Sequence, residues 1–413
     1  MATQARRAGK ALAASSYQDR QRILNAIADR IDGDIAAIVA KNEEDVTRER
    51  EAGMNESLLD RLTLNQSRVQ AIASATRKVA ALANPLGQVK VSRRLENGLQ
   101  LDQVTVPFGV VGMIYEARPN VTVDAAVILL MSGNASLLRG SSSAHLSNEY
   151  LVDLMRDVIA KEGFDPELIQ LIPSSDRDSV RELLHARGDV DLVIPRGSAA
   201  LIRMVVDEAL VPTIETGAGV CHIFFDLSAD AKKALPILVN AKTNRPSVCN
   251  SVETLLVHRS RKDDLLPDAL RELTSHKVKL HCDERTLQVA RSLGIEAHPA
   301  SDANFHTEYG RLEINIAVVD DLDAAIAHID RFGTKHTEAI ITEDADEAKR
   351  FVSMIDAAAV MINASTRFTD GEEMGFGAEI GISNQKLHAR GPMGLEAMTT
   401  TTWVVSGNGQ VRS

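Results

Sequence analysis

Short apolar stretches alternate with longer amphipathic ones through the middle of the chain, and this alternation constrains the fold more than any other feature. Between residues 109 and 217 the apolar stretches have strand length, and the intervals between them have helical spacing. The predicted strands are Val110–Ile114, Ser136–Leu138, Leu168–Ile172, Leu192–Ile194 and Thr213–Glu215. The predicted helices are Val121–Met131, Ala144–Lys161, Arg177–His185 and Ala199–Ala209. Such alternation is typical of a doubly wound parallel sheet, which binds nucleotides at the carboxyl ends of its strands.

A second series of the same kind begins near Ile223. Its predicted strands are Glu253–Val257, Asn315–Val318, Ala339–Ile341 and Val360–Ile362, and its predicted helices are Leu322–Arg331 and Asp346–Ile355. Residues 1–85 have helical spacing throughout. Because 413 residues are enough for two or three domains, the sequence predicts an α/β protein with two doubly wound domains.

A β-hairpin is predicted between the N-terminal helices and the first α/β series. Asn97-Gly98 stands between the alternating segments Val89–Val91 and Leu99–Leu101, and Asn-Gly in this setting is the strongest short-range hairpin signal. The tail Thr401–Val405 also has strand character. We expect these segments to form a projecting arm that carries a subunit contact and makes the protein a homo-oligomer, either a dimer or a tetramer.

Composition and charge exclude several classes of protein. A formal net charge of −11 argues against a nucleic-acid partner, because binding to phosphate backbones needs clustered Lys and Arg. Three cysteines without a C-x-x-C pair make neither a disulfide framework nor a zinc site, and we expect no metal. The N-terminus lacks the apolar region of a signal peptide, and the most apolar run, Ala125–Met131, is too short to cross a bilayer. We therefore expect a cytoplasmic protein with no membrane contact.

Cys249 is the candidate nucleophile. It lies in a polar, proline-containing loop between a predicted helix and a predicted strand, where a thiol can be reached. Lys242 and Arg245 are close in sequence and could favour the nucleophilic thiolate. The alternative is that Cys249 is a small buried hydrophobe, as free cysteine often is.

Two turns in the first α/β series are candidates for binding phosphate. Arg139-Gly140-Ser141 and Arg196-Gly197-Ser198 each follow a predicted strand and precede a helix, where unpaired backbone N–H groups attract anions. An ordinary strand-to-helix turn explains either one alone. Together they favour nucleotide binding.

Three further polar residues allow a chemical or a structural interpretation. Glu215 precedes a glycine-rich turn and is either a general base or a structural residue. Asn120 precedes a predicted helix and is either its N-cap or a donor to an oxyanion. Arg367 lies in a loop of Ser, Thr and Asn, which suits a carboxylate or phosphate ligand as well as a surface ion pair.

The order of these segments resembles the aldehyde dehydrogenase superfamily across nearly the whole chain. PFGVVGMIYEARPN resembles the segment that ends in the family's oxyanion asparagine, here Asn120, and IETGAG resembles the segment of its glutamate, here Glu215. SGNASLLRGSSSA and VIPRGS are similar to its two cofactor-binding segments, and Cys249 follows Glu215 at the family's separation. NASTRFTDG and QKLHARGPMGLEAMTT are close to signatures of the family's branch that reduces an acyl phosphate.

The resemblance implies a reaction and a role for each candidate. The implied reaction is the NADPH-dependent reduction of L-glutamate 5-phosphate to L-glutamate 5-semialdehyde in proline biosynthesis, through a thioester on Cys249 with Asn120 stabilising the oxyanion. NADH is the alternative cofactor. The implied cofactor contacts are Arg139, which would hold the extra ribose phosphate, with Gly140, Ser141, Arg196, Gly197, Ser198 and Glu313. The implied substrate contacts are Arg118 for the acyl phosphate and, for the α-carboxylate, Arg367 with Ser365.

The same resemblance implies the domain organisation and the partners. Residues 1–88 and 107–221 would bind NADPH, residues 222–397 would form the catalytic domain, and residues 89–106 and 398–413 would form the oligomerisation arm. The partners implied are a small acyl phosphate and, functionally, glutamate 5-kinase. Two alternatives stay open: a hydrolytic NAD(P)-dependent aldehyde dehydrogenase with Glu215 as its base, and a non-catalytic nucleotide-binding scaffold.

Overall fold

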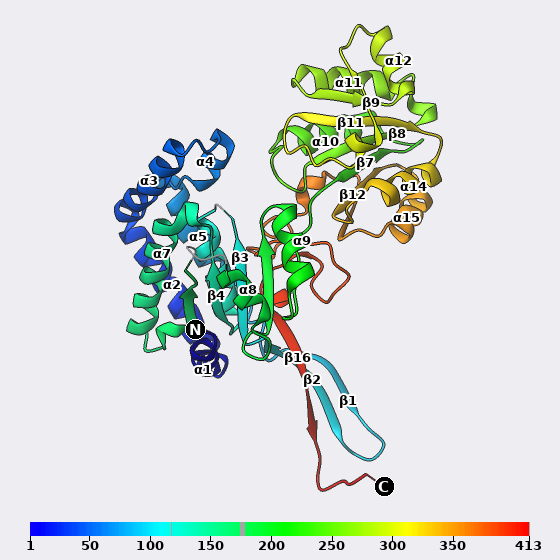
Figure 1. The fold of residues 1–413 in the computed structure, drawn as a ribbon. Coiled ribbons are helices and arrows are strands. Elements are labelled where there is room, and N and C mark those ends of the chain that lie inside the picture. Colours follow the sequence, from blue (N-terminus) through cyan, green and yellow to red (C-terminus); the bar gives the residue numbers. More distant parts are fainter. Residues whose placement is uncertain (117, 174–177, 413) are drawn as a thin grey trace. The chain divides into compact units, whose positions relative to one another are not determined.

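The computed structural model describes residues 1–116, 118–173 and 178–412. The chain divides into two compact units (Figure 1). Unit 1 comprises Met1–Thr216, Gly375–Gly381 and Pro392–Ser413, and unit 2 comprises Gly217–Met374 and Ile382–Gly391. Both are built on parallel sheets, so the predicted α/β fold class is confirmed.

Unit 1 begins with five helices. They are α1 (Ala2–Ala13), α2 (Tyr17–Gly33), α3 (Ile35–Glu51), α4 (Glu56–Leu62) and α5 (Gln66–Ala81). A capping box of Ser16 and Asp19 starts α2, because each side chain accepts an N–H of the other residue's backbone. Buried Ile23, Ile27 and Ile31 then face the core. The helical prediction for this region is confirmed.

A four-stranded parallel sheet in the order β5-β4-β3-β6 forms the centre of unit 1. Its strands are β3 (Val110–Tyr115), β4 (Ala135–Arg139), β5 (Ile169–Leu171) and β6 (Leu192–Arg196). The connecting helices are α6 (Asn120–Met131), η1 (Ser142–Ala144), α7 (His145–Lys161), η2 (Pro166–Leu168), α8 (Asp178–His185) and α9 (Ala199–Glu208). Arg177, the predicted start of α8, lies outside the described residues.

One predicted strand of unit 1 is wrong. The segment Thr213–Glu215 contributes only a single bridge, in which Thr213 pairs with Val193 of β6. Hydrogen bonds there join Val193 N–H to the Pro212 carbonyl and Ile214 N–H to the Val193 carbonyl. Pro212 has no N–H of its own, so the ladder cannot extend toward the N-terminus.

A three-stranded antiparallel sheet forms an arm, defined here as β1 (Val89–Arg94), β2 (Gln100–Pro107) and β16 (Thr399–Ser406) in the order β1-β2-β16. Its strands extend from the rest of unit 1 as a long ribbon (Figure 1). Gly98 closes the hairpin with φ +85°, a left-handed conformation that favours glycine. The predicted hairpin and the predicted C-terminal strand are both confirmed.

Unit 2 contains a seven-stranded parallel sheet in the order β10-β9-β11-β8-β7-β12-β13. Its strands are β7 (Cys221–Phe225), β8 (Val252–His258), β9 (Lys279–Cys282), β10 (His298–Pro299), β11 (Glu313–Val319), β12 (Thr337–Ile341) and β13 (Ala359–Ile362). The helices are α10 (Ala231–Thr243), η3 (Arg259–Arg261), α11 (Leu265–Ser275), α12 (Glu284–Ser292), α13 (Asp302–Phe305), α14 (Leu322–Phe332), α15 (Ala345–Met354) and η4 (Thr366–Phe368). Three short elements complete the chain: β14 (Ile382–Ser383), β15 (Gly391–Pro392) and η5 (Glu396–Met398).

Helices cover both faces of the unit 2 sheet. Adjacent residues of one strand belong to different hydrophobic clusters: Phe225 packs with α10, α11 and α12, while Phe224 packs with α14 and α15. The sequence prediction missed every element between β8 and β11. In β9 and β10 the strands have only four and two residues, too few for a periodic signal.

No helix within the described ranges is long and apolar enough to cross a membrane.

Candidate active site

Cys249 lies in the loop between α10 and β8, as predicted. We call residues 244–251 the Cys249 loop. The thiol is half-buried, whereas Cys221 and Cys282 are buried. Burial raises the pKa of the Cys282 thiol to about 12 and the pKa of the Cys221 thiol well above its ordinary value. Cys249 is therefore the cysteine that a dissolved substrate can reach.

The backbone carbonyl of Cys249 lies against Gly219 and Cys221, at the start of β7. Cys221 donates its S–H to the Cys249 carbonyl oxygen at 3.2 Å. A Cβ on Gly219 would lie 1.5 Å from the same oxygen, so only glycine fits there. The Cys249 peptide is thus fixed in orientation before any ligand arrives.

Asn250 connects the Cys249 loop to the segment around η4. Its Nδ2 donates to the Thr369 carbonyl at 2.9 Å, and its own carbonyl accepts the Thr366 hydroxyl at 2.7 Å. Its Oδ1 accepts a guanidinium N–H of Arg367. The residue beside the nucleophile is therefore bound through three of its polar atoms.

Arg367 and Ser365 lie at the Cys249 loop, so unit 2 brings three of the predicted residues together. Besides bonding Asn250, the Arg367 Nε donates to Asn244 Oδ1 at 3.3 Å. Burial lowers the pKa of Arg367, against the attraction of Asp370 and Cys249. The Ser365 hydroxyl accepts the Arg367 backbone N–H at 3.3 Å and caps η4. A cation near a thiol favours the thiolate.

The expectation that Lys242 favours the Cys249 thiolate is wrong. Its ammonium is fully buried and bonds Glu253 Oε2 at 2.7 Å, which neutralises its charge. Arg245 is exposed on the Cys249 loop. Arg367 is a cation that contacts the loop from outside.

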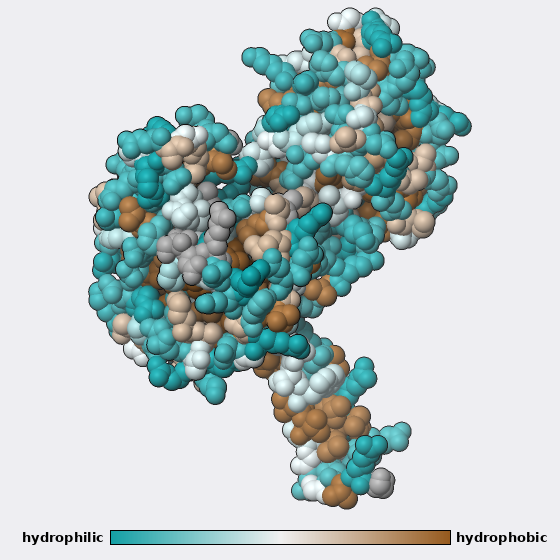
Figure 2. Space-filling model, in the orientation of Figure 1, coloured by the Kyte–Doolittle hydropathy of each residue, from teal (hydrophilic) through white to brown (hydrophobic). Residues whose placement is uncertain are grey.

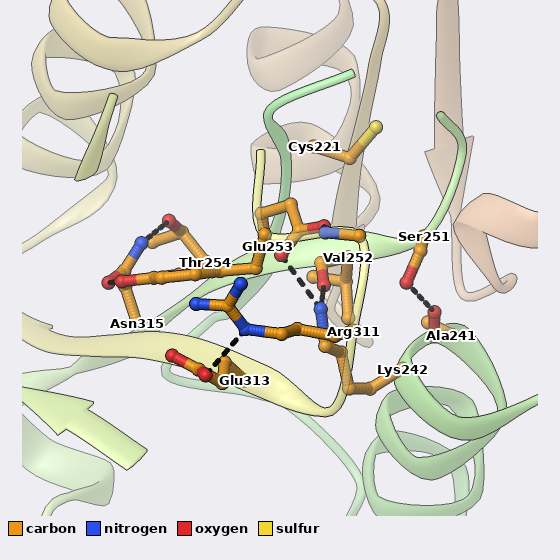
Figure 3. Close-up of polar contacts among 12 residues, drawn as sticks. Cys221, Ala241, Lys242, Ser251, Val252, Glu253, Thr254, Arg311, Glu313 and Asn315 are labelled. Atoms are coloured by element: carbon orange, nitrogen blue, oxygen red, sulfur yellow. Dashed lines mark hydrogen bonds and ion pairs between the residues drawn. The ribbon is translucent and has the colours of Figure 1, made fainter. Parts of the chain in front are cut away.

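Glu313 lies at the start of β11, and both of its carboxylate oxygens have protein partners. Arg311 Nε donates to Oε1 at 2.6 Å, and His281 Nε2 lies 2.8 Å from Oε2. The bond from Arg311, together with that from His281, lowers the pKa of Glu313 to about 2. Figure 3 shows the Arg311–Glu313 contact.

In unit 1, Asn120 is the first residue of α6 rather than its N-cap. The N-cap position belongs to Pro119, so the interpretation of Asn120 as a capping residue is wrong. Its Nδ2 donates to Asp124 Oδ2 at 2.8 Å, one helical turn later. Burial raises the pKa of Asp124, while the bond from Asn120 opposes that rise. The amide group is therefore oriented by a carboxylate.

Arg139, Gly140 and Ser141 follow the carboxyl end of β4. Arg139 Nη1 donates to the Gly140 carbonyl at 3.1 Å, and Ser141 caps η1 by accepting the Ser143 N–H at 3.2 Å. A Cβ on Gly140 would lie 2.2 Å from Asn148 Nδ2. Any larger residue would have to displace the Asn148 amide, so the turn favours glycine, as a close-packed nucleotide-binding turn does.

Arg196, Gly197 and Ser198 follow the carboxyl end of β6, where α9 begins. Glu116 occupies the N-terminus of this helix: its carboxylate accepts the Ser198 backbone N–H at 2.7 Å and the Ser198 hydroxyl at 3.0 Å. Helix N-termini attract anions, and a protein carboxylate takes that place here. Arg196 donates to the Ile380 carbonyl.

The two remaining predicted residues also lie in unit 1. Glu215 is half-buried in the extended segment after the Thr213 bridge, next to Thr216, whose hydroxyl donates to the Pro195 carbonyl at 3.1 Å. Arg118 is half-buried in the loop between β3 and α6, where its carbonyl accepts the Val121 N–H at 3.0 Å.

Sequence reasoning missed several residues of the site. Asp124 had a signal, since residues four apart share a helix face. Glu253 also had one, because a charge in the apolar stretch VETLLV is rare unless it is paired. The contacts of Cys221 and Asn250 had none, because they depend on which strands become neighbours.

Comparison with known proteins identifies close relatives over the full length. A model of the aldehyde dehydrogenase family matches residues 1–290. The gamma-glutamyl phosphate reductase of Thermobifida fusca (strain YX) is 51% identical over 412 residues, which are 100% of this chain and 98% of the relative. The enzyme of that name from Clavibacter michiganensis subsp. michiganensis (strain NCPPB 382) is 50% identical over 408 residues, with 99% and 94% covered.

Solved structures agree with these relatives. The crystal structure of gamma-glutamyl phosphate reductase from Thermotoga maritima superposes with a TM-score of 0.96 at 44% identity, and the match covers 100% of this chain and 99% of that one. An acetylating aldehyde dehydrogenase from Geobacillus thermoglucosidasius has a TM-score of 0.71 at 17% identity, covering 100% and 96%, which demonstrates a shared fold.

Proposed function

The chain belongs to the aldehyde dehydrogenase family, and from this premise we propose that it reduces γ-glutamyl phosphate to glutamate 5-semialdehyde in proline biosynthesis. The observation that carries the proposal is the identity of 51% with a gamma-glutamyl phosphate reductase along the whole chain. The accessible thiol of Cys249, held in a tied loop, supplies the chemistry such a reaction needs. Family membership implies a nicotinamide cofactor, and we propose that it is NADPH.

Cys249 is proposed as the nucleophile. Its thiolate attacks the acyl carbon of the substrate, a carbon–sulfur bond forms, and the bond to the phosphate oxygen breaks as inorganic phosphate leaves. A mixed anhydride has a good leaving group, so this step needs little general acid. Attraction to Arg367, which is bound to the next residue Asn250, stabilises the thiolate that attacks.

Asn120 is proposed to donate from its side-chain amide to the oxyanion that develops during attack and reduction. An amide that is already oriented loses little freedom when it binds the developing charge. The bond to Asp124 supplies that orientation. The Cys249 backbone N–H is proposed as the second donor, and the contacts to the Cys249 carbonyl hold its peptide group in place.

The cofactor residues are proposed from the ends of β4 and β6. A cofactor with a pyrophosphate group suits the turn at Gly140, where a Cβ would lie against Asn148. At the start of α9 the pyrophosphate would replace the Glu116 carboxylate, which accepts the Ser198 N–H. Arg139 would hold the extra ribose phosphate that distinguishes NADPH from NADH. Gly140, Ser141, Arg196, Gly197, Ser198 and Glu313 are proposed as the remaining contacts. When bound, the nicotinamide supplies the hydride that reduces the acyl group held on Cys249.

Substrate recognition is proposed to use three residues. Arg367, whose guanidinium is anchored to Asn244 and Asn250, would bind the α-carboxylate with help from Ser365. Arg118 would meet the acyl phosphate. Glu215 is proposed as structural or only weakly active, because a base that activates water would hydrolyse the thioester before reduction.

Oxidation of glutamate 5-semialdehyde, assayed with and without inorganic phosphate and with NADP or NAD, tests the function. We expect turnover that requires phosphate and favours NADP. Phosphate-independent oxidation to the free acid would instead identify a hydrolytic dehydrogenase with Glu215 as its base. No turnover, together with no stoichiometric alkylation of Cys249, would identify a non-catalytic scaffold.

Association with glutamate 5-kinase is also proposed, because an acyl phosphate is short-lived in water and transfer between adjacent enzymes would protect it. The expected observation is co-sedimentation of the two purified enzymes. Independent sedimentation at micromolar concentrations would count against a stable complex.

A further inference from the structure

A buried ion pair lies at the base of the Cys249 loop. Lys242, in the last turn of α10, extends its ammonium to Glu253 Oε2 at 2.7 Å and to the Val252 carbonyl at 2.9 Å (Figure 3). Both side chains have an exposed fraction of 0%. Glu253 Oε1 accepts the Gly310 N–H at 3.2 Å. Each charge is therefore neutralised and further hydrogen-bonded.

These contacts join the two ends of the Cys249 loop. Lys242 immediately precedes Thr243, the last residue of α10, and Val252 and Glu253 are the first two residues of β8. A further bond runs from the Ser251 hydroxyl to the Ala241 carbonyl at 3.2 Å (Figure 3). The exit of the helix and the entry of the strand are thus tied by three side-chain hydrogen bonds, and the loop between them has little freedom to shift.

Stability alone is a weak reason for such a pair. Removing two charges from water is costly, and apolar residues of similar volume are often as stabilising as a buried ion pair. Burial raises the pKa of Glu253 to about 7, which reflects this cost. Positioning of the backbone is a stronger reason for the pair. The Lys242 ammonium can reach both the Glu253 carboxylate and the Val252 carbonyl in only one arrangement of the end of α10 and the start of β8.

We propose that Lys242 and Glu253 are a positioning pair that fixes the base of the Cys249 loop and so places the Cys249 thiol for attack. This inference rests on the proposed function of Cys249. Neither residue of the pair reaches solvent, so both act through the loop rather than on the substrate. A displacement of about 1 Å at a reacting group can lower turnover roughly 100-fold.

The test compares wild type with the double variant Lys242→Met, Glu253→Leu, which replaces the charges by apolar side chains. Leu270→Ala is the matched control, because Leu270 is buried in the hydrophobic cluster that also contains Ala241 and Val252, and it lies on α11 rather than in the loop. Three quantities are measured on each folded protein: kcat, KM, and the pH dependence of Cys249 alkylation by iodoacetamide, followed by peptide mapping.

We expect the double variant to fold and to lose roughly 10- to 100-fold in kcat, with KM changed less than about twofold. Its alkylation midpoint should move to higher pH, because the loosened loop no longer holds Cys249 near Arg367. Leu270→Ala should have a lower Tm, unchanged kcat and an unchanged alkylation midpoint. A double variant with wild-type kcat and wild-type alkylation, or a control that loses as much kcat, would overturn the inference.

Glu253→Gln decides the question if the double variant does not fold. Glutamine keeps the shape and can still accept from Lys242, so a smaller fall in kcat with the same direction of alkylation shift is expected. If Glu253→Gln changed neither kcat nor the pH midpoint of alkylation, the inference would be overturned. Alkylation of Cys249 needs no substrate. It therefore tests the positioning role of Lys242 and Glu253 even if Cys249→Ser retains turnover and the proposed function fails.

Discussion

Around Cys249, individual residues act mainly by fixing a backbone. The Cys221 thiol bonds the Cys249 carbonyl, Gly219 has no side chain and so leaves room for that carbonyl, and Asn250 is bound through three of its polar atoms. The same arrangement separates the roles of the cysteines. Cys221 is a buried donor, and Cys249 is the thiol that can meet a substrate.

At this scale the first prediction concerns Cys249 and Glu215. Cys249→Ser should lower reductive turnover by at least about 1,000-fold, since it removes the nucleophile. Glu215→Gln should stay within roughly threefold of wild type, because reduction needs no activated water. The measurement is the initial rate of phosphate-dependent oxidation of glutamate 5-semialdehyde, which is the proposed reduction run in reverse through the same thioester. Equal losses in the two variants would mean that Glu215 has a direct chemical role.

A second prediction follows from the contact at Gly219. Gly219→Ala should reduce kcat roughly 100-fold, because the new methyl group would overlap the Cys249 carbonyl and displace it. Gly33→Ala is the control, since a Cβ there has no neighbour within 4 Å. Steady-state kinetics and thermal melting separate a displaced nucleophile from a lost fold. Wild-type kcat in Gly219→Ala would refute the rigid-carbonyl interpretation.

The elements set where these residues meet. In unit 2 the parallel pairing of β7 with β8 brings Cys221 opposite Val252, and α10 returns the chain across one face of the sheet to start β8. The Cys249 loop therefore lies at the amino edge of two neighbouring strands. In unit 1 the carboxyl ends of β4 and β6 carry the two candidate phosphate turns, each followed by a helix.

A prediction at the scale of elements concerns the start of β11. Arg311 and His281 lower the pKa of Glu313 in the folded protein to about 2, below its ordinary value of 4.5. Because its pKa is lower in the folded protein than in the unfolded chain, the ionised Glu313 stabilises the fold at pH values above 4.5. That contribution is lost as the pH falls from 4.5 toward 2. Glu313→Gln should therefore melt with a shallower dependence on pH below 4.5, measured as Tm against pH. If the slope of Tm against pH were the same in the variant and in wild type, the contacts of Glu313 with Arg311 and His281 would add no stability.

The arm belongs to the scale of the whole molecule. Figure 2 shows hydrophobic side chains gathered on it, and Trp403, Val404 and Val405 of β16 are 51%, 46% and 54% exposed. A strand with such residues at a sheet edge invites pairing with another chain. We propose that the arm mediates homo-oligomerisation.

Charge on the arm should therefore lower the oligomeric state. Trp403→Asp with Val405→Asp is expected to give a smaller species in sedimentation velocity, while unit 1 and unit 2 remain folded by circular dichroism. Val411→Asp is the control, because Val411 is 90% exposed beyond the end of β16. A variant that sediments as wild type does would exclude the arm as the contact.

The sequence by itself determined much of the element order and the loop position of Cys249, although it missed the elements between β8 and β11. Periodicity, the Asn97-Gly98 turn and the proline-containing loop around Cys249 are local signals, so both α/β series, the hairpin and the accessible cysteine could be predicted. The two errors have different sources. The strand predicted at Thr213–Glu215 overlooks the missing N–H of Pro212, which is itself a local signal. Lys242 looks like a partner of Cys249 until the fold places Glu253 beside it.

Only the tertiary structure decided what each side chain contacts. Gly219 meets the Cys249 carbonyl, Arg367 meets Asn250, and Lys242 meets Glu253 because strand order and register bring distant segments together. Register is a property of the packed sheet, since a shift of one residue would exchange its two faces. The chain thus encodes its chemistry locally at Cys249, and the fold supplies the contacts that orient it.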